Sequence, residues 1–199
     1  MEQPRIVLAS ASPRRRELLD LVGIRHTVVP ADIDESMVGV ELPDAHAERL
    51  AREKAAIVAE RHPEALVIAA DTIVVVGERI LGKPRTEREA AEMLRVLSGE
   101  THTVVTGMAC ALNGRIESSV DDVFVTFRPL SDEEIDEYVA TGEPMDKAGS
   151  YGIQGFGATI VRRIDGDYFA VMGLSLVRLV GLMQRLGVRY HFGGGTRST

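Results

Sequence analysis

The sequence predicts an α/β protein in which two lobes share one sheet. Short runs of hydrophobic and β-branched residues, which are typical of buried strands, alternate with segments whose hydrophobic residues recur at helical spacing. Neither an internal repeat nor a low-complexity linker divides the chain into independent parts. We therefore expect a single domain of two lobes over residues 1–190, followed by a flexible glycine-rich tail over residues 191–199.

The composition is that of an ordinary globular protein, with 199 residues of which 45% are hydrophobic and 27% charged. The single cysteine, Cys110, cannot form an internal disulfide, and its hydrophobic neighbours predict a buried strand residue rather than a reactive thiol. No hydrophobic run approaches the length of a membrane-spanning helix, and the first residues do not resemble a secretion signal. These features predict a cytoplasmic protein that does not bind membranes.

The charge distribution favours a small anionic ligand over nucleic acid. A net charge of -7 argues against a general nucleic-acid binder, because such binding depends on a broad basic surface. Positive charge is instead concentrated locally, at residues 14–16, at Lys83 with Arg85, and at Lys147. This pattern predicts a small polyanion bound in a basic cleft.

The first half of the chain carries clear start and stop signals. Residues 6–9 predict a buried strand, and Ser12 followed by Pro13 predicts the start of a helix that Gly23 ends. A second helix is expected from about residue 44 to 61, and the hydrophobic run 66–76 predicts a central strand.

Capping boxes and turn residues mark the elements of the second half. An S/T-x-x-E box at 86–89 and another at 131–134 predict helices that end near residues 97 and 142. The other expected elements are strands 103–112 and 120–127 joined by the Asn-Gly turn at 113–114, a strand over 158–164, and a helix over 174–186.

Residues 10–16 (SASPRRR) form the first candidate site, because they lie where a strand passes into a helix. The N-terminus of a helix presents unpaired N–H groups, so hydroxyls and guanidinium groups beside it can bind phosphate. The alternative is a capped surface helix whose arginines are simply solvated.

Asp71 is the second candidate, because it interrupts the hydrophobic run 66–76 together with Thr72. A buried carboxylate is costly unless it is paired, hydrogen-bonded or bound to metal, so this position suggests a general base or a metal ligand. The alternative is that Asp71 lies at the end of a strand and hydrogen-bonds within a turn.

Two glycine-containing segments follow. Residues 80–85 (ILGKPR) lack the spacing of a P-loop, and Lys83 and Lys54 taken alone are typical solvated lysines. Residues 146–155 (DKAGSYGIQG) suggest a backbone that approaches a ligand closely, with Tyr151 and Gln154 available to a planar base. The amide of Gln154 offers a donor and an acceptor, which suits uracil or thymine, although an irregular surface loop is the alternative.

No hydrolytic triad is indicated, and the five histidines lack metal-ligand spacing. The segments above, in their order and spacing, resemble the Maf family of nucleotide pyrophosphatases, once described as septum-formation inhibitors. The match extends over nearly all of the chain except the tail and includes residues 52–55, 97–99 with His102, and 173–174. The resemblance implies an elongated mixed sheet flanked by helices, the Maf/inosine-triphosphatase-like architecture, with an active site in a cleft between two lobes.

The resemblance also implies hydrolysis of dTTP and UTP between the α- and β-phosphates, assisted by a divalent cation, Mg²⁺ or Mn²⁺. Asp71 matches the proton-acceptor position, and Glu35 matches a position that binds metal. The matches to substrate-binding positions are Ser10, Arg14, Lys54 and Lys83 for phosphate, and Arg14, Thr72 and Gln154 for the specificity of the dTTP/UTP branch.

Three alternatives remain at this point. The enzyme could act on 7-methyl-GTP, as another branch of the family is thought to do. The protein could instead be a nucleotide-binding regulator of cell division whose hydrolysis is incidental. A non-enzymatic α/β scaffold is disfavoured, because Asp71 would then be a buried cost without a use. A homodimer is compatible with all three.

Overall fold

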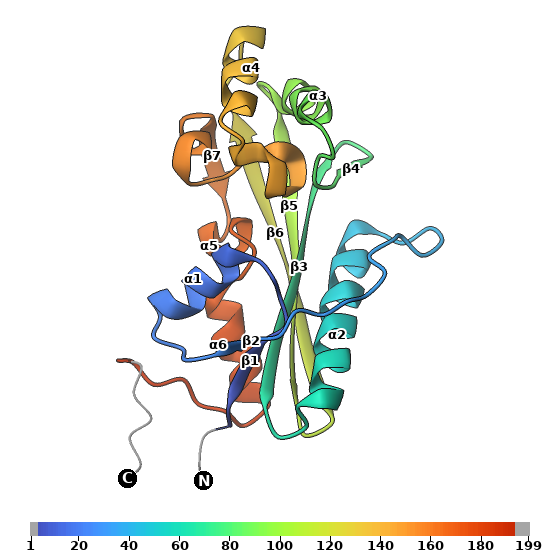
Figure 1. Cartoon of the computed structure of the whole chain (residues 1–199), viewed down its shortest axis with the longest axis vertical. Coiled ribbons are helices and arrows are strands. Elements are labelled where there is room, and N and C mark those ends of the chain that lie inside the picture. Colours follow the sequence, from blue (N-terminus) through green and yellow to red (C-terminus); the bar gives the residue numbers. More distant parts are fainter. Residues whose placement is uncertain (1–3, 194–199) are drawn as a thin grey trace. The chain divides into compact units, whose positions relative to one another are not determined.

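The computed structural model describes residues 4–193 and contains one seven-stranded sheet (Figure 1). The strand order is β2-β1-β3-β5-β6-β7, and β4 pairs with β3. β1 runs parallel to β2 and β3, whereas the pairs β3–β4 and β6–β7 are antiparallel, so the sheet is mixed. The strands are β1 (Ile6–Leu8), β2 (Thr27–Val28), β3 (Leu66–Val76), β4 (Arg79–Leu81), β5 (Thr101–Leu112), β6 (Arg115–Phe127) and β7 (Val161–Asp165).

Helices alternate with these strands along the chain, which confirms the predicted α/β class. The α-helices are α1 (Pro13–Leu21), α2 (Pro43–Arg61), α3 (Glu87–Leu97), α4 (Asp132–Ala140), α5 (Tyr168–Val171) and α6 (Leu176–Arg185). Three 3₁₀ turns lie between α4 and β7: η1 (Glu143–Asp146), η2 (Ala148–Ser150) and η3 (Gly155–Thr159). None of the helices within residues 4–193 has the length and hydrophobicity needed to cross a bilayer.

The chain divides into two compact units. Unit 1 contains residues up to 71 together with 106–121 and those from 173 onward, and unit 2 contains residues 72–105 and 122–172. The long strands β3, β5 and β6 each contribute residues to both units. The tail predicted over 191–199 lies outside the described residues from position 194 onward.

In unit 1, α2 packs against the sheet through small side chains. Ala51, Ala55 and Val58 of α2 form one buried cluster with residues of β1, β3 and β5. At the other end of the contact, a Cβ on Gly107 would overlap the carbonyl group of Ala47, so only glycine permits this approach of helix and strand. The close packing turns Lys54, on the same stripe of α2, toward the sheet.

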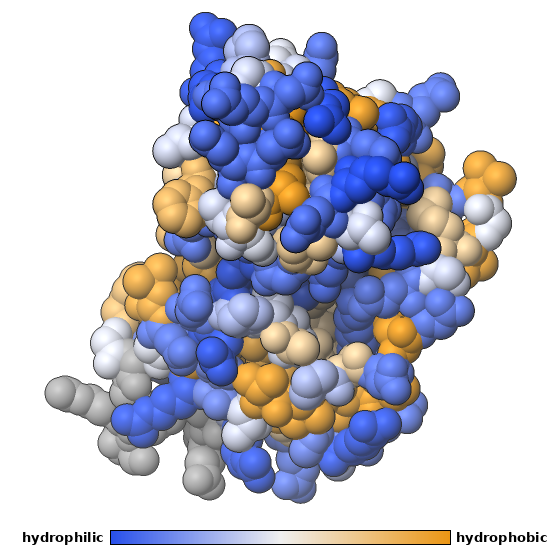
Figure 2. All heavy atoms as spheres, turned by 45° about the horizontal axis from the view of Figure 1, so that its top comes forward, coloured by the Kyte–Doolittle hydropathy of each residue, from blue (hydrophilic) through white to orange (hydrophobic). Residues whose placement is uncertain are grey.

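Unit 2 has its own core. It is formed by α3, α4, parts of β3 to β7, and residues from the turns that follow α4. Leu94, Leu97 and Ile135 are among its fully buried side chains. The outer surface that α3 and α4 present is predominantly hydrophilic (Figure 2), as expected for amphipathic helices that cover one side of a core.

The boundaries confirm most of the predicted elements and correct some. β3 spans the predicted residues 66–76, and the hairpin β5–β6 turns at Asn113 and Gly114, both at positive φ. The predicted strand 158–164 begins only at Val161, because residues 155–159 form η3. The strand expected from 120 begins at Arg115, since the two-residue turn lets pairing start immediately after it. The short elements β2, β4 and α5 were not predicted.

Capping follows the predictions in part. Ser131 and Glu134 form the complete reciprocal capping box at the start of α4. At α3, Thr86 accepts a hydrogen bond from the Glu89 N–H, but the Glu89 carboxylate accepts from the N–H of Arg85, so the box is incomplete. Ser12 precedes α1 without a side-chain cap, and its N–H instead donates to the hydroxyl of Ser10.

Candidate functional site

Asp71 lies in the middle of β3, with buried residues on both sides of it in the strand. This position excludes the alternative that Asp71 belongs to a turn at a strand end. Its side chain is 11% exposed, so the carboxylate is largely removed from water without being sealed from it. A carboxylate in this setting needs a compensating charge.

Lys54 supplies that charge from α2. Its Nζ lies 2.7 Å from Asp71 Oδ1 and 2.6 Å from Glu35 Oε1. The side chain of Lys54 is 8% exposed, whereas that of Glu35 is 58% exposed. One buried cation is therefore shared by a buried carboxylate and an exposed one. The structure thus brings together three residues that the sequence predicted separately.

The second carboxylate oxygen of Asp71 remains available for chemistry. Within residues 4–193, the hydrogen bond and ion pair of Asp71 are both made through Oδ1. Oδ2 makes neither of these contacts, and it is not one of the fully buried atoms without a partner in this part of the chain, so water can reach it. Lys54 therefore holds the carboxylate by one oxygen, and the other can accept a hydrogen from a water molecule.

The segment that carries Glu35 is held in place from both sides. The carboxylate of Asp34 accepts a hydrogen bond from the Ser36 N–H, and Arg49 Nη2 donates to the Ser36 carbonyl group at 3.1 Å. Arg49 is itself bound in bidentate fashion by Glu41, at 2.7 and 3.1 Å. Hydrogen bonds from Arg49 and His46 lower the pKa of Glu41 to about 2, so this anchor stays charged at neutral pH.

Asp71 and Glu35 also offer the donor set that a hard divalent cation prefers. Mg²⁺ is commonly held by one or two carboxylates, with water and substrate phosphates completing its shell. Two carboxylates that contact the same nitrogen atom fit this pattern. In residues 4–193, no group of three or more His, Cys, Asp or Glu side chains is arranged to hold a metal by itself. A cation at this position would therefore depend on ligands from a bound substrate.

Arg15 is a residue of this site that the sequence did not single out. Its Nη1 donates to the carbonyl group of Ala70 at 2.7 Å and to the hydroxyl of Ser10 at 3.1 Å, and its Nε donates to the carbonyl group of Gly173 at 2.8 Å. Burial lowers the pKa of the Arg15 guanidinium, and the charge of Asp71 opposes this shift. Arg15 thus ties the start of α1 to β3 and to the chain before α6.

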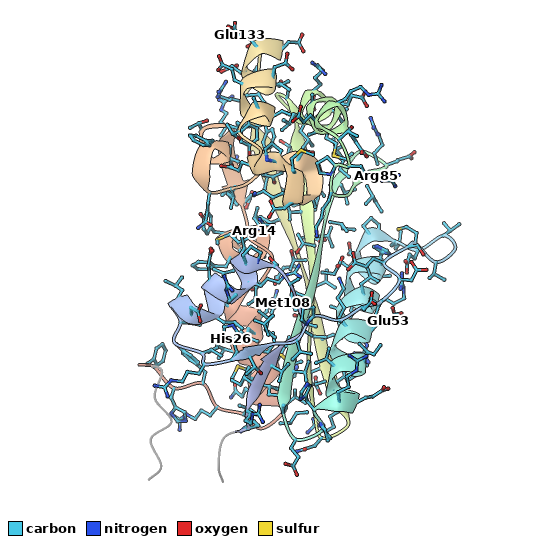
Figure 3. The ribbon with its side chains drawn as sticks, viewed as in Figure 1. Arg14, His26, Glu53, Arg85, Met108 and Glu133 are labelled. Carbon is cyan, nitrogen blue, oxygen red and sulfur yellow. The ribbon has the colours of Figure 1, made fainter. Side chains whose placement is uncertain are left out.

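The contacts of Ser10 leave its hydroxyl hydrogen as a donor. The oxygen accepts from Arg15 Nη1 and from the Ser12 N–H. A hydroxyl has two acceptor positions and one hydrogen, so these two bonds occupy its acceptor capacity. Ser10 is 8% exposed and lies three residues before α1 begins at Pro13, near the helix N-terminus, where an anion would be favoured. Arg14, labelled in Figure 3, follows in the first turn of that helix.

The remaining predicted substrate-binding residues belong to unit 2. Thr72 follows Asp71 in β3, and Lys83 is exposed just after β4. The Gly149 N–H donates to the Gly82 carbonyl group at 3.1 Å, which joins the turn that carries Lys83 to the turn at η2. Gln154 is exposed and directly precedes η3.

Tyr151 does not have the predicted role, because it belongs to the core of unit 2. Only 5% of it is exposed, and its ring packs edge-on against Phe127 and His102. Its hydroxyl lies 2.8 Å from His102 Nε2. Burial lowers the pKa of His102 to about 4, so the imidazole is neutral at physiological pH. Of Tyr151 and Gln154, only Gln154 is exposed to solvent.

Replacing Arg15 by Ala should lower the free energy of unfolding by about 2–3 kcal/mol, because two carbonyl groups and the Ser10 hydroxyl lose a charged donor. Arg16→Ala is the matched control, since Arg16 is the next residue of α1 and is exposed, and it should change stability by less than about 0.5 kcal/mol. Urea denaturation of the two variants measures both values. Equal losses would show that Arg15 has no special structural role.

Comparisons with known proteins identify relatives of this chain. A family model described as Maf-like protein matches residues 5–186. The chain is 50% identical over 182 residues to a dTTP/UTP pyrophosphatase from Geobacillus sp., covering 92% of this chain and 98% of that protein. It is 47% identical over 187 residues to a protein of the same name from Halalkalibacterium halodurans, covering 94% and 98%.

A third relative and one solved structure complete the comparison. The dTTP/UTP pyrophosphatase of Aquifex aeolicus is 46% identical over 184 residues, covering 92% of this chain and 96% of that protein. The crystal structure of a nucleoside-triphosphatase, a dITP/XTP pyrophosphatase from Mycobacterium abscessus, covers 91% of this chain and 94% of its own, at 14% identity and a TM-score of 0.45. A TM-score of this size is too low to define the fold. The family model and the sequence relatives suffice, and the chain belongs to the Maf-like protein family.

Proposed function

We propose that this protein is a nucleoside triphosphate pyrophosphatase that converts dTTP and UTP to the nucleoside monophosphate and pyrophosphate. The observation that carries the proposal is the cluster in which Lys54 pairs with both Asp71 and Glu35. Such a cluster would supply a base, a cation for phosphate and a second carboxylate. The names of the relatives, which cover nearly all of their length and of this chain, support the pyrimidine substrates over 7-methyl-GTP.

Asp71 is the proposed general base. Its Oδ2 would accept a proton from the water that attacks the α-phosphate, while Lys54 holds Oδ1. Asp71 has a short side chain, lies within a strand and is fixed by a buried ion pair. It therefore loses little conformational freedom during the reaction. Such positioning and electrostatic stabilisation are the main sources of catalysis in phosphoryl transfer.

The triphosphate would be bound by donors that the sequence places in several segments. In unit 1, the hydroxyl of Ser10 and the guanidinium of Arg14 are assigned to phosphate at the N-terminus of α1. In unit 2, Lys83 is assigned to phosphate, and Thr72 and Gln154 to the specificity for the pyrimidine nucleotide, on the basis of the sequence. Gln154 supports the assignment by its exposure and by an amide that can pair with the edge of uracil.

A divalent cation, Mg²⁺ or Mn²⁺, would be held by Glu35 together with phosphate oxygens, while Asp71 serves as the base. When bound, it neutralises charge on the phosphate oxygens. The protein's own contribution at this position is the exposed carboxylate of Glu35, which Lys54 holds beside Asp71. A cytoplasmic location and a homodimer remain predictions from the sequence.

Incubation with UTP should release pyrophosphate and UMP. EDTA should lower the rate of release at least about 100-fold until Mg²⁺ or Mn²⁺ is restored, because protein cations alone cannot neutralise a triphosphate. The assay separates pyrophosphate from orthophosphate and compares UTP, dTTP, CTP, ATP and 7-methyl-GTP. UDP as the main product would contradict the proposal. Preference for 7-methyl-GTP would assign the protein to the other branch, and tight binding without turnover would favour a regulator.

A further inference from the structure

The segment that presents Gln154 is fastened at both ends to two side chains. At its start, the Gly152 N–H donates to the hydroxyl of Tyr138 at 3.0 Å. At its end, the N–H groups of Phe156 and Gly157 donate to Glu143, each at 2.9 Å. Gln154 lies between these attachment points and is exposed.

Tyr138 and Glu143 are also bound to each other. The hydroxyl of Tyr138 donates to Glu143 Oε1 at 2.8 Å while it accepts from Gly152. Glu143 Oε1 therefore accepts from Tyr138 and Gly157, and Oε2 accepts from Phe156. The four hydrogen bonds form a continuous network around residues 152–157.

The backbone of this segment is shaped around the Glu143 carboxylate. Gly155 has a φ of +66°, and a Cβ at this position would overlap Glu143 Oε2. A side chain here would have to displace the carboxylate or the loop, so the chain comes close to Glu143 only because residue 155 is glycine. Lys147 contacts the backbone of the same residue, because its Nζ donates to the main-chain carbonyl group of Glu143 and to the carboxylate of Asp146.

The network favours the ionised form of Glu143, whose two oxygens accept three hydrogen bonds. Burial raises its pKa, but the hydrogen bonds from Gly157, Phe156 and Tyr138 together outweigh burial, so the pKa lies below its ordinary value. An ionised glutamate only accepts hydrogen bonds, so it suits these three donors. The side-chain amide of a glutamine at this position would point an N–H group at one of the donors. The charge, and not only the length, of the side chain thus matters.

We propose that Glu143, with Tyr138, is a positioning residue that holds the Gly152–Gly157 segment so that Gln154 can recognise a pyrimidine base. The inference rests on the proposed function and deepens it, because it assigns base selectivity to a carboxylate that does not touch the base. Glu143 acts through Gln154. Its loss should therefore weaken the hydrolysis of UTP selectively and leave the chemistry at the phosphates unchanged.

The test compares kcat/KM for UTP and ATP in four proteins: the parent, Glu143→Gln, Gln154→Ala and the double variant. The UTP-to-ATP ratio should fall about tenfold or more in either single variant, as expected when a hydrogen-bonded recognition group is lost. In the Gln154→Ala background, Glu143→Gln should change the ratio less than about twofold, because both act on one interaction. Tyr138→Phe, which removes a single hydroxyl, should lower the ratio in the same direction.

Glu137→Gln is the matched control, since Glu137 is an exposed acid of α4 and the substitution removes the same charge. It should keep the parent ratio. Hydrogen exchange provides a readout that does not depend on activity: the amides of Phe156 and Gly157 should exchange about tenfold faster or more in Glu143→Gln than in Glu137→Gln.

Each outcome decides a different question. A parent that does not prefer UTP to ATP contradicts the proposed function before any variant is measured. If the parent prefers UTP but Glu143→Gln keeps the parent's UTP-to-ATP ratio, only the positioning role is overturned. The same holds if Glu143→Gln lowers the ratio as much in the Gln154→Ala background as in the parent. Unchanged exchange of the two amides also overturns it, and a loss that is equal for UTP and ATP would make Glu143 a general structural residue.

Discussion

Asp71→Asn should bind UTP about as tightly as the parent and hydrolyse it roughly 10²–10⁴-fold more slowly, because the amide keeps the shape of the side chain but cannot accept a proton. Pre-steady-state or product-release assays give the turnover, and equilibrium binding of a non-hydrolysable UTP analogue gives the affinity. Lys54 keeps Glu35 as a partner in this variant, so folding should be retained.

Lys83→Ala provides the contrast to Asp71→Asn. Lys83 is proposed to bind phosphate in both the ground state and the transition state, so its loss should weaken binding as well as slow turnover. The two variants therefore separate a base from a binding group. Near-native turnover of Asp71→Asn at saturating metal would make the carboxylate structural, and Glu35 would become the first alternative base.

Lys54→Met should lower the free energy of unfolding by about 3 kcal/mol and reduce turnover by at least about 100-fold, because it leaves the buried carboxylate of Asp71 without its cation. Urea denaturation and the pyrophosphate assay measure the two effects. Arg61→Met is the control, since Arg61 is exposed in the last turn of the same helix and its loss removes the same charge.

A double variant tests the physical reason for this loss. If the cost is an uncompensated charge, Lys54→Met with Asp71→Asn should be more stable than Lys54→Met alone by about 1–2 kcal/mol, because the carboxylate has been removed as well. Activity should not return. A double variant that is less stable than either single variant would show that packing, and not charge, explains the effect of Lys54→Met.

Local signals in the sequence were sufficient for the longer elements. The run of eleven residues that forms β3 carries its own hydrophobic pattern, and the turn at Asn113 and Gly114 requires positive φ at both positions. The short strands β2 (Thr27–Val28) and β4 (Arg79–Leu81) were missed because they are too short to show a period. Their formation depends on a neighbouring strand rather than on their own composition.

The arginine cluster at 14–16 shows where local signals end. All three residues have the same chemistry, and the helical repeat alone does not say which of them points inward. Arg15 is selected because acceptor groups lie within reach, including the carbonyl group of Gly173, which is 158 positions away in the chain. Glu143 was missed for the same reason, since its donors at Phe156 and Gly157 come from another part of the loop.

The sequence by itself determined the α/β alternation, the interruption of a hydrophobic strand by Asp71, and the types of group that a phosphate site requires. Tertiary structure alone decided that Lys54 is the partner of Asp71, that Tyr151 is buried in a core, and that Glu143 fastens the segment of Gln154. The division has a physical reason. Backbone propensity and hydrophobic period are properties of neighbouring residues, whereas ion pairs, burial and hydrogen-bond networks depend on which distant elements pack together.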